Sequence, residues 1–229
     1  MNKILIVRIG EGLGNQLFMY ANAYSLSKKF GYNLYIDDES GFSKNKRSRF
    51  YNLNLFDIPN KICPDKLKSN TLIKNFKRKS SKFIDKFISN KKFITESIDI
   101  NKQTNYVEIS NIESYKIFVE GHYECELYFK DYEKDLKKIF TIKDDLIDKH
   151  NTYIDRIKRS NSVSIHLRKN RFTEDFNNKK ISNKNKDAIF EENLVNYVSR
   201  SIEYCDKKLD NPHYFIWSND NNSFKQFFL

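Results

Sequence analysis

Hydrophobic positions near the start of the chain change from a strand-like to a helix-like pattern and back again. Residues 3–8 (KILIVR) form a short apolar run, which is typical of a strand buried in a parallel sheet. Residues 17–30 have the pattern of a helix that ends at Gly31, and residues 33–37 (NLYID) form a second strand. A strand, a glycine-containing loop, a helix and a strand make one βαβ unit, so the sequence predicts an α/β fold.

The rest of the chain repeats these element types. Strands are predicted at 116–121, 162–167 and 213–217, helices at 126–139, 144–158 and 188–208, and a helical stub leads to Leu229. The polar stretch 155–162 precedes a new run of strands, which places a domain boundary between residues 1–157 and 158–229. Two strands and one full helix cannot cover both faces of a parallel sheet. We therefore expect that the halves share one sheet or that the second half is incomplete in this chain.

Residues 71–92 carry a basic amphipathic pattern. Between Lys74 and Lys92 there are eight basic residues and one acid, Asp85, which accounts for +7 of the net charge of +11. We expect a helical insertion, within about residues 61–105, whose apolar face packs on the core. The segment would also suit an anionic lipid surface or an RNA backbone. Aromatic residues on a helix stripe do not form the sheet platform on which RNA bases stack, which counts against RNA. The apolar positions at roughly helical spacing are Leu72, Ile73, Phe76, Phe83, Ile84, Phe87 and Ile88.

Composition excludes several classes of protein. The chain has 229 residues, of which 39% are hydrophobic, and this apolar content excludes a disordered chain. Three widely spaced cysteines exclude a disulfide framework or a zinc ribbon and indicate a reducing compartment. The N-terminus lacks the apolar core and cleavage site of a signal peptide, and no run approaches the ~18 apolar residues of a membrane span. We expect a soluble cytoplasmic protein with no metal site.

Glycines gather directly after the first predicted strand. Gly10, Gly12 and Gly14 lie within five residues. Glycines let a ligand approach the backbone closely, and the N-terminus of the following helix carries a partial positive charge. The spacing is neither GxGxxG nor a P-loop, and it equally fits a tight strand-to-helix turn. The adjacent amides of Asn15 and Gln16 favour a polar ligand.

A second candidate site is His166-Leu167-Arg168-Lys169, at the end of the strand predicted for residues 162–167. Ligands of open α/β sheets bind at the carboxyl ends of the strands. His166 and Arg168 are two positions apart, so they project on the same side. An imidazole that recognises a base beside a guanidinium that holds a phosphate would suit a nucleotide. A solvated strand end with ordinary basic residues has the same pattern.

The order of these motifs resembles a known enzyme family. Residues 12–18 (GLGNQLF), with Tyr20 and Ala21, closely resemble the GGLGNQLFQYA signature of bacterial α-1,2-fucosyltransferases, glycosyltransferase family 11. Residues 121–129 (GHYECELYF) are similar to the family's GYWQSEKYF stretch. His166-Leu167-Arg168-Lys169 is similar to its HxRR motif, and Trp217-Ser218-Asn219-Asp220 to its FSDD motif. The matches keep the family's order across nearly the whole chain.

The resemblance implies a GT-B-like fold with two Rossmann-like halves, an acceptor-side N-terminal domain and a C-terminal domain that binds the donor nucleotide. It implies an inverting fucosyltransferase that moves L-fucose from GDP-fucose to a galactose-type hydroxyl of a glycan in α-1,2 linkage. The product would be a bacterial surface polysaccharide such as an O-antigen or capsule. The reaction would need no metal and no cofactor besides the GDP-fucose donor.

The resemblance also assigns roles to residues. Arg168 would hold the β-phosphate and stabilise the charge that develops on the departing GDP, with Lys169 in the place of a second arginine. Glu11, the acid nearest the expected reaction centre, is a candidate for the base that takes the proton of the attacking hydroxyl, although an exposed loop carboxylate is a commoner interpretation. His166 and Asp220 would approach the guanine, and the reaction centre would include Gly12, Gly14, Asn15 and Gln16.

The chain also departs from the family pattern. Lys169 replaces the second arginine of HxRRGD, Arg171 replaces its aspartate and Asn219 replaces the first aspartate of FSDD. Lysine keeps the charge but lacks the bidentate fork of arginine. The chain ends at Leu229, before the family's NSTFSWW-like segment, so a truncated non-catalytic relative is one alternative. A basic protein that binds lipid or nucleic acid through residues 74–92 is another. Contact with the inner face of the membrane would be compatible with the transferase.

Overall fold

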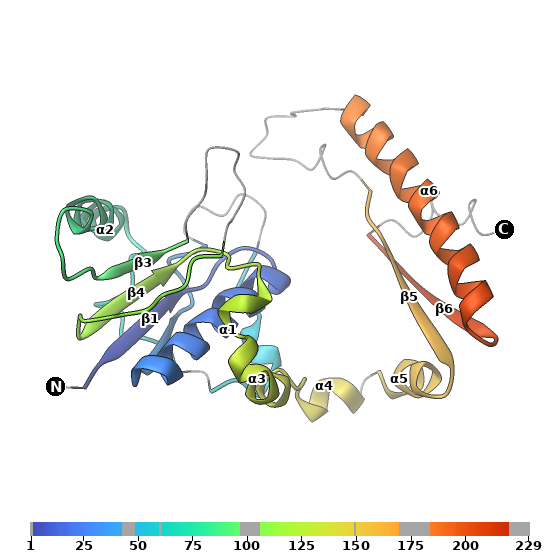
Figure 1. Ribbon diagram of the computed structural model, residues 1–229, viewed down its shortest axis with the longest axis horizontal. Helices are drawn as coiled ribbons and strands as arrows, with labels where there is room; N and C mark the ends of the chain where they lie inside the picture. The colour runs from blue at the N-terminus through green and yellow to red at the C-terminus, as the bar shows by residue number, and fades with distance from the viewer. Residues whose placement is uncertain are drawn as a thin grey trace. The chain divides into compact units, whose positions relative to one another are not determined.

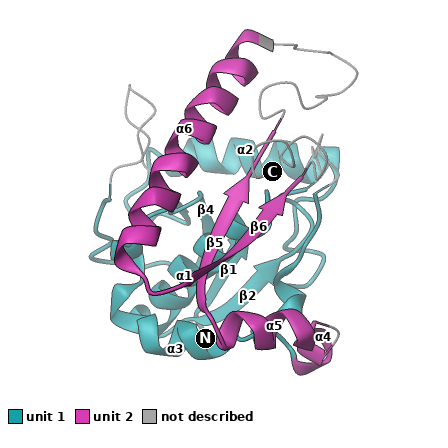
Figure 2. Cartoon of the chain, turned by 90° about the vertical axis from the view of Figure 1, so that its right-hand side faces the viewer, with its two compact units in different colours: residues 1–143 teal, residues 144–229 magenta. Residues whose placement is uncertain are grey.

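The computed structural model forms two compact units, residues 1–143 and residues 144–229 (Figures 1 and 2). The sequence placed the boundary after residue 157. The units divide instead before α4 (Asp144–Asp148) and α5 (Asn151–Lys158), so both helices belong to the second unit. The structure describes residues 2–42, 49–59, 61–96, 106–148, 150–169 and 184–219.

The first unit is built on a four-stranded parallel sheet in the order β2-β1-β4-β3 (Figure 1). In the register of the sheet, Val7 of β1 lies between Ile36 of β2 and Val119 of β4. Because the strands are parallel, their carboxyl ends share one edge, from which the loops with the candidate residues start. The strands are β1 (Ile4–Arg8), β2 (Asn33–Asp37), β3 (Phe93–Thr95) and β4 (Lys116–Glu120).

Helix α1 (Leu13–Phe30) covers one face of this sheet. It ends at Gly31, which has a left-handed φ of 71° and donates its backbone N–H to the carbonyl of Ser27. The predicted βαβ unit is therefore present, with a helix that begins four residues earlier than the pattern indicated. The core between helix and sheet includes Leu5, Val7, Met19, Ala23, Leu26, Ile117 and Val119.

Helix α2 (Leu72–Asp85) lies on the opposite face of the sheet and exposes its apolar stripe. Leu72 is 87% exposed, Phe76 72% and Phe83 62%. The expectation that the apolar face packs on the core is wrong. Polar groups of the helix face the sheet instead. The carboxylate of Asp85, for example, accepts the backbone N–H groups of Lys92 and Phe93 at 2.7 and 3.0 Å.

The helix predicted for residues 126–139 is interrupted. Residues 126–132 form two 3₁₀ turns, η2 (Glu126–Tyr128) and η3 (Lys130–Tyr132), and only α3 (Glu133–Ile139) is α-helical. Aromatic packing holds the first turn, since the ring of Tyr128 meets the rings of Tyr106 and Tyr123 edge-on. A further short turn, η1 (Leu53–Leu55), contributes the buried Leu53 to the core.

The second unit contains another βαβ unit, with β5 (Asn161–Leu167), α6 (Lys184–Lys208) and β6 (Pro212–Ser218). In the described ranges the two parallel strands pair only with each other, so the two halves do not share a sheet. Helix α6 covers one face of the strand pair. The small core on that face contains Ile165, Leu167 and Val198, with Leu194, Ile202 and Tyr214 packed against it. No helix within the described residues has the length and apolar character of a membrane span.

Candidate functional site

The glycine loop joins β1 to α1 at the carboxyl edge of the first sheet. Gly12 is the N-cap of α1 with φ −77°, and Gly14 lies in the first turn of the helix. A Cβ atom built at Gly12 or Gly14 would meet nothing within 4 Å, and neither residue has a positive φ. Packing and backbone conformation therefore do not require glycine at these two positions. The open space beside the helix N-terminus is what a ligand approaching the backbone would need.

Gly41, in contrast, is required by packing, and Gly10 lies in tight contact with it. A Cβ at Gly41 would lie 1.8 Å from the carbonyl oxygen of Ile9, and a Cβ at Gly10 would lie 3.2 Å from the carbonyl oxygen of Gly41. The loop after β2 thus rests directly on the backbone that precedes the glycine loop. This backbone contact fixes the position at which the glycine loop leaves the end of β1.

Gln16, predicted to lie at the reaction centre, has a fully buried side chain. Its amide nitrogen donates to the carbonyls of Glu11 and Phe50 at 3.0 and 2.9 Å, and its amide oxygen accepts the backbone N–H of Asn52 at 2.9 Å. The side chain therefore ties the glycine loop to residues 49–52 and has a positioning role. Asn15 is half-buried, and its side-chain amide forms no hydrogen bond within the described residues.

Glu11, the candidate base, sits at a strained point of the loop. Its φ is 64°, in the left-handed region that favours glycine. Its half-exposed carboxylate forms an ion pair with Arg49. This pairing occupies the carboxylate, so a role as base requires Arg49 to move away.

A buried charge cluster lies at the same edge of the sheet, and sequence reasoning missed it. Glu120, at the end of β4, forms ion pairs with Arg78 and, at 2.9 Å, with Lys82 of α2. Arg8, at the end of β1, donates to the carbonyl of Ser40 at 2.5 Å. The Nε atoms of Arg8 and Arg78 are buried and have no hydrogen-bond partner in the part of the chain that the structure describes. No spacing rule links these residues, which come from three separate segments.

Burial and mutual charge shift the pKa values in this cluster. Burial lowers the pKa of Arg8, and the neighbouring charge of Arg78 lowers it further. Burial alone would raise the pKa of Glu120, but hydrogen bonds and ion pairs with Lys82 and Arg78 outweigh it, so the pKa lies below its usual range. Glu120 is therefore held as a carboxylate that fixes α2 to the sheet.

The loop after β4 contains a second candidate for proton transfer. The carboxylate of Glu96 accepts the backbone N–H groups of His122 and Tyr123 at 2.7 and 2.9 Å, which fixes the loop. Gly121 is required here, because a Cβ would lie 2.5 Å from the Cβ of Glu96. The exposed imidazole of His122 lies with Nδ1 3.8 Å from the carboxylate of Glu124. The sequence feature that could have identified this residue is its position, since His122 directly follows Gly121 at the end of a predicted strand.

In the second unit, β5 brings His166 to the exposed face of the strand pair. Ile165 and Leu167 point into the core, so the alternation of the strand turns His166 to the other face. His166 lies in register with Trp217 of β6, whose indole N–H donates to Ser164 Oγ at 3.1 Å. The predicted strand is present, and its histidine is exposed.

The residues after β5 are held by the loop after β6. The side-chain amide of Asn219 accepts the backbone N–H of Lys169 at 2.9 Å and donates to its carbonyl at 3.1 Å. The Nζ atom of Lys169 lies 3.7 Å from the carboxylate of Glu191 on α6, a neighbour that the sequence did not reveal. Arg168 is half-buried. Asp220 and Arg171 lie outside the described residues.

The structure thus places the predicted residues in two groups. One group surrounds the glycine loop in the first unit, and the other group, His166, Arg168 and Lys169, follows β5 in the second unit. Within the described residues, no three His, Cys, Asp or Glu side chains gather as metal ligands.

Comparison with known proteins finds no matching family model. The chain is 28% identical to the alpha-1,2-colitosyltransferase of Escherichia coli over 218 residues, which cover 95% of this chain and 69% of that protein. It is similar in structure to the fucosyltransferase NodZ from Bradyrhizobium, with a TM-score of 0.54 at 12% identity over 99% of this chain and 75% of NodZ. A crystal of the NodZ α-1,6-fucosyltransferase soaked with GDP-fucose gives a TM-score of 0.52 at 13% identity, over 99% of this chain and 74% of that one.

These similarities bear on the fold first. The fold is GT-B-like. The predicted fold class, α/β with parallel sheets, is confirmed. The relative in sequence and the neighbours in structure are all glycosyltransferases, one for colitose and the others for fucose.

Proposed function

We propose that this chain is a glycosyltransferase that takes its sugar from a GDP-linked donor, with GDP-fucose as the first candidate. The observation that carries the proposal is the position of His166, Arg168 and Lys169 at the carboxyl end of a parallel strand. This is where open α/β sheets bind nucleotides. The similarity to a colitosyltransferase over 95% of the chain supports the same class of activity.

The donor would bind to the second unit. Departure of GDP leaves negative charge on the β-phosphate, and a fixed cation placed there lowers the energy of the transition state. We assign this role to Arg168, with Lys169 as a second positive charge whose backbone is held by Asn219. His166 and Asp220 would recognise the guanine. The two basic side chains would do the work that a metal ion does elsewhere, so the reaction is proposed to need no metal.

The acceptor would bind to the first unit, near the glycine loop. In an inverting transfer, the acceptor oxygen attacks the anomeric carbon from the face opposite GDP, and the bond to the β-phosphate oxygen breaks as the new bond forms. The hydroxyl proton passes to a base. Glu11 and His122 are the candidates for this base, because both follow neighbouring strands of the same sheet. Gly12, Gly14 and Asn15 would leave room for the reacting atoms.

The sugar and the linkage are the finer parts of the proposal. Colitose is fucose without the 3-hydroxyl group, so a site for one sugar needs little change for the other. We propose an α-1,2 linkage to a galactose-type hydroxyl of a bacterial surface glycan. The chain would act at the inner face of the membrane, where such glycans are assembled.

The test is a transfer assay with the full chain. GDP-fucose, GDP-colitose, GDP-mannose and a UDP-sugar are each offered with a β-galactoside acceptor, in Mg²⁺ and in EDTA, and the product linkage is read by NMR. The proposal predicts an α-1,2 product from a GDP-linked 6-deoxy sugar, with equal yield in both buffers. Transfer from the UDP-sugar alone, or transfer that EDTA abolishes and Mg²⁺ restores, would contradict it.

The base is tested by substitution. Glu11→Gln and His122→Asn are compared for turnover and for GDP affinity. A base is identified by a fall in turnover of roughly 100-fold or more with unchanged GDP affinity. Equal turnover in both variants and in the wild type would exclude both residues.

A second activity is favoured by one feature of α2. Its exposed apolar stripe, together with the lysines of residues 74–92, suits an anionic membrane surface. Binding to a membrane is compatible with the transferase. A role in nucleic-acid binding, in contrast, would be an alternative to the transferase. Two measurements separate these functions: retention of RNA that falls as salt rises indicates nucleic-acid binding, and binding of GDP-sugars indicates the transferase.

A further inference from the structure

Helix α2 is inverted with respect to the usual packing of a helix on a sheet. An amphipathic helix normally turns its apolar stripe to the core. In α2, Arg78 and Lys82 bind Glu120 on the sheet side, whereas Phe76 and Phe83 point to solvent. The stripe continues beyond the helix with Phe87, which is 77% exposed and packs edge-on against Phe83. A contiguous exposed apolar surface of this kind marks a binding surface.

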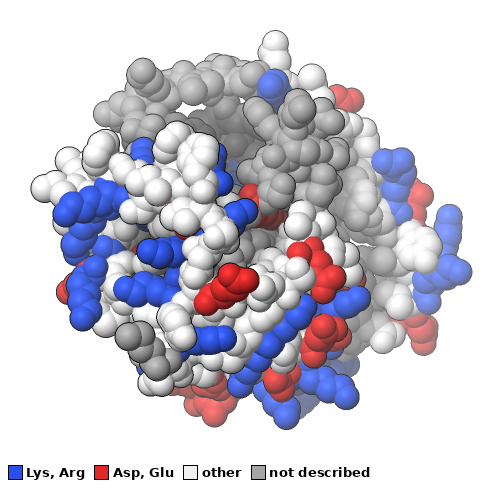
Figure 3. Space-filling view, turned by 60° about the vertical axis from the view of Figure 1, so that its left-hand side comes forward, with Lys and Arg blue, Asp and Glu red and all other residues white. Residues whose placement is uncertain are grey.

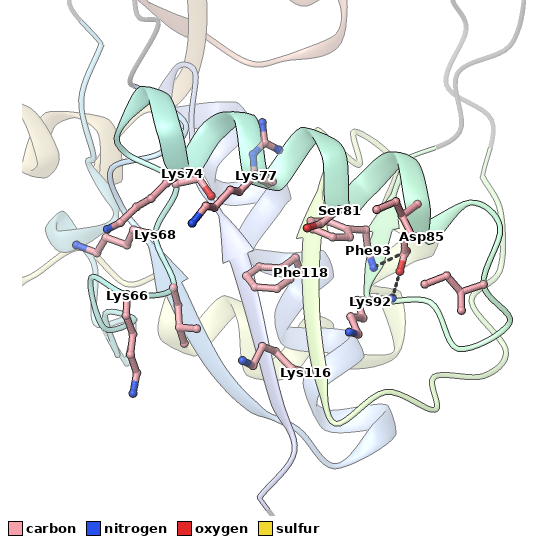
Figure 4. A pocket seen from close by; sticks show the side chains of 15 residues that line it. Lys66, Lys68, Lys74, Lys77, Ser81, Asp85, Lys92, Phe93, Lys116 and Phe118 are labelled. Carbon is pink, nitrogen blue, oxygen red and sulfur yellow. Dashed lines mark hydrogen bonds between the residues drawn. The ribbon is translucent and has the colours of Figure 1, made fainter.

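A basic cavity of about 510 Å³ lies between α2 and the sheet (Figure 4). Its volume is in the range of small-molecule sites. The rings of Phe93 and Phe118 stack with their centres 5.2 Å apart on the sheet side of the cavity. In Figure 4, Lys77 lies above the Phe118 ring and Lys116 lies below it. Among the residues that line the cavity are Lys66, Lys68, Lys74, Lys77, Lys92 and Lys116.

The charge in this cavity is only partly compensated. Lys68 is paired with Asp38 and Glu39 at 2.8 and 2.5 Å. The lining contains one acid, Asp85, and its carboxylate is used by backbone N–H groups. Within the described ranges, Lys77 and Lys116 form no ion pair. Like charges around one cavity repel each other, so the cavity is complementary to an anion.

We propose that α2 and this cavity form a site for an anionic lipid, with the phosphate head group in the cavity and the apolar stripe in the lipid layer. Ile84 and Ile88 line the cavity and are themselves 57% and 42% exposed, so apolar surface runs from its wall to the stripe. A ligand that fits both parts has a phosphate at one end and hydrocarbon at the other.

The distribution of charge also favours a lipid layer. Lys79 and Lys86 flank the stripe, and a helix with lysines beside an apolar face lies in the interface of an anionic membrane. Figure 3 shows blue basic side chains with white side chains between them on the side of the molecule that carries α2. A soluble phosphate would leave the stripe unused, and a second copy of this basic surface would bring like charges together.

The test is co-sedimentation of the full chain with vesicles of phosphatidylcholine, alone or mixed with phosphatidic acid. We expect binding to the mixed vesicles only. The double variant Lys77→Gln/Lys116→Gln should weaken it by more than the roughly thirtyfold expected for any two lysines at a membrane surface, because these two also face the phosphate in the cavity. Both side chains are exposed, so the variant should fold.

Two control variants separate the cavity from general attraction. Lys79→Gln/Lys86→Gln removes the same charge from the same segment outside the cavity, and Lys207→Gln/Lys208→Gln removes it from α6. The first should weaken binding less than the cavity variant does, and the second should leave it unchanged. Phe76→Ser/Phe83→Ser should abolish binding, whereas Ile189→Ser, at another exposed apolar position, should not.

Several results would overturn this site. They are failure of the folded wild type to bind the mixed vesicles, equal losses in the Lys77/Lys116 and Lys79/Lys86 variants, and retention of RNA without vesicle binding. If the wild type does not bind vesicles but forms dimers, and Phe76→Ser/Phe83→Ser abolishes these dimers, the apolar stripe is an interface with a second copy of the chain. The lipid site does not rest on the proposed transferase activity. GDP binding by the same variants is measured separately, so a failure of the lipid site and a failure of the donor site can be told apart.

Discussion

The side-chain amide of Asn219 is hydrogen-bonded to both the N–H and the carbonyl of Lys169, at 2.9 and 3.1 Å. Only a group that both donates and accepts can do this. The asparagine thus links the loop after β6 to the residue next to Arg168. An aspartate would accept from the N–H but could not donate to the carbonyl.

The variant Asn219→Asp is therefore expected to weaken GDP binding, although it restores the residue of the family motif. Loss of one hydrogen bond at an exposed site amounts to about 1 kcal/mol, or roughly fivefold in affinity. Calorimetric titration with GDP measures the change. Affinity equal to or higher than that of the wild type would show that this amide does not position the donor site.

The variant Gly14→Ala should separate function from folding. A Cβ at this position meets nothing, and alanine in a helix is favoured over glycine by up to about 1 kcal/mol, so the melting temperature should stay or rise. If a substrate approaches the backbone here, turnover should fall. Thermal unfolding and the transfer assay together give the answer, and unchanged turnover would remove Gly14 from the reaction centre.

Gly41→Ala is the control for Gly14→Ala, because here the same substitution meets a steric clash. Its Cβ would lie 1.8 Å from the Ile9 carbonyl oxygen, so the backbone must shift and the melting temperature should fall. A protein that tolerates this change would show that the loop after β2 is free to move away from Gly10.

The variant Glu120→Gln should destabilise the first unit by about 3 kcal/mol at neutral pH, because it leaves the largely buried positive charge of Arg78 without its counter-charge. The pKa of Glu120 is lower in the folded state than in the unfolded chain. Its contribution is therefore present above the unfolded pKa of about 4.3 and is lost as pH falls through the folded pKa. Urea unfolding at several pH values measures the difference.

The control for this variant is Glu133→Gln. Glu133 pairs with Lys137 on the surface, where both side chains are mostly exposed and solvent screens the pair, so this variant should unfold at nearly the wild-type urea concentration. A difference between wild type and Glu120→Gln that does not shrink in acid would contradict the role of the carboxylate charge.

Local patterns predicted the elements of the two βαβ units. The apolar run of β1, the helix pattern that ends at Gly31 and the alternation of β5 depend on neighbours in sequence, and the structure contains each of them. The interpretation of α2 failed, because a distant segment decides how this helix packs. Periodicity showed that α2 is amphipathic, but the choice of the inward face was made by Glu120, which lies 38 to 42 positions away from its partners.

The candidate site could be predicted in outline. The positions of His166, Arg168 and the glycine loop follow from strands that local patterns identify. The roles of single side chains could not be predicted. Gln16 forms hydrogen bonds with Phe50 and Asn52, and Asn219 with Lys169, and these partners lie too far apart in sequence for a local pattern to reveal them. The three-residue strand β3 was missed because so short a strand leaves almost no period to detect.

Binding of GDP through Arg168 is the central claim, and calorimetric titration of the full chain with GDP, GDP-fucose and UDP tests it most directly. Charge-assisted hydrogen bonds contribute about 1.5–3 kcal/mol, so Arg168→Ala should weaken GDP binding roughly 10- to 100-fold. The matched variant Arg200→Ala, on the exposed side of α6, should bind like the wild type. Equal GDP affinity in all three proteins, or binding of UDP as tight as that of GDP, would contradict the claim.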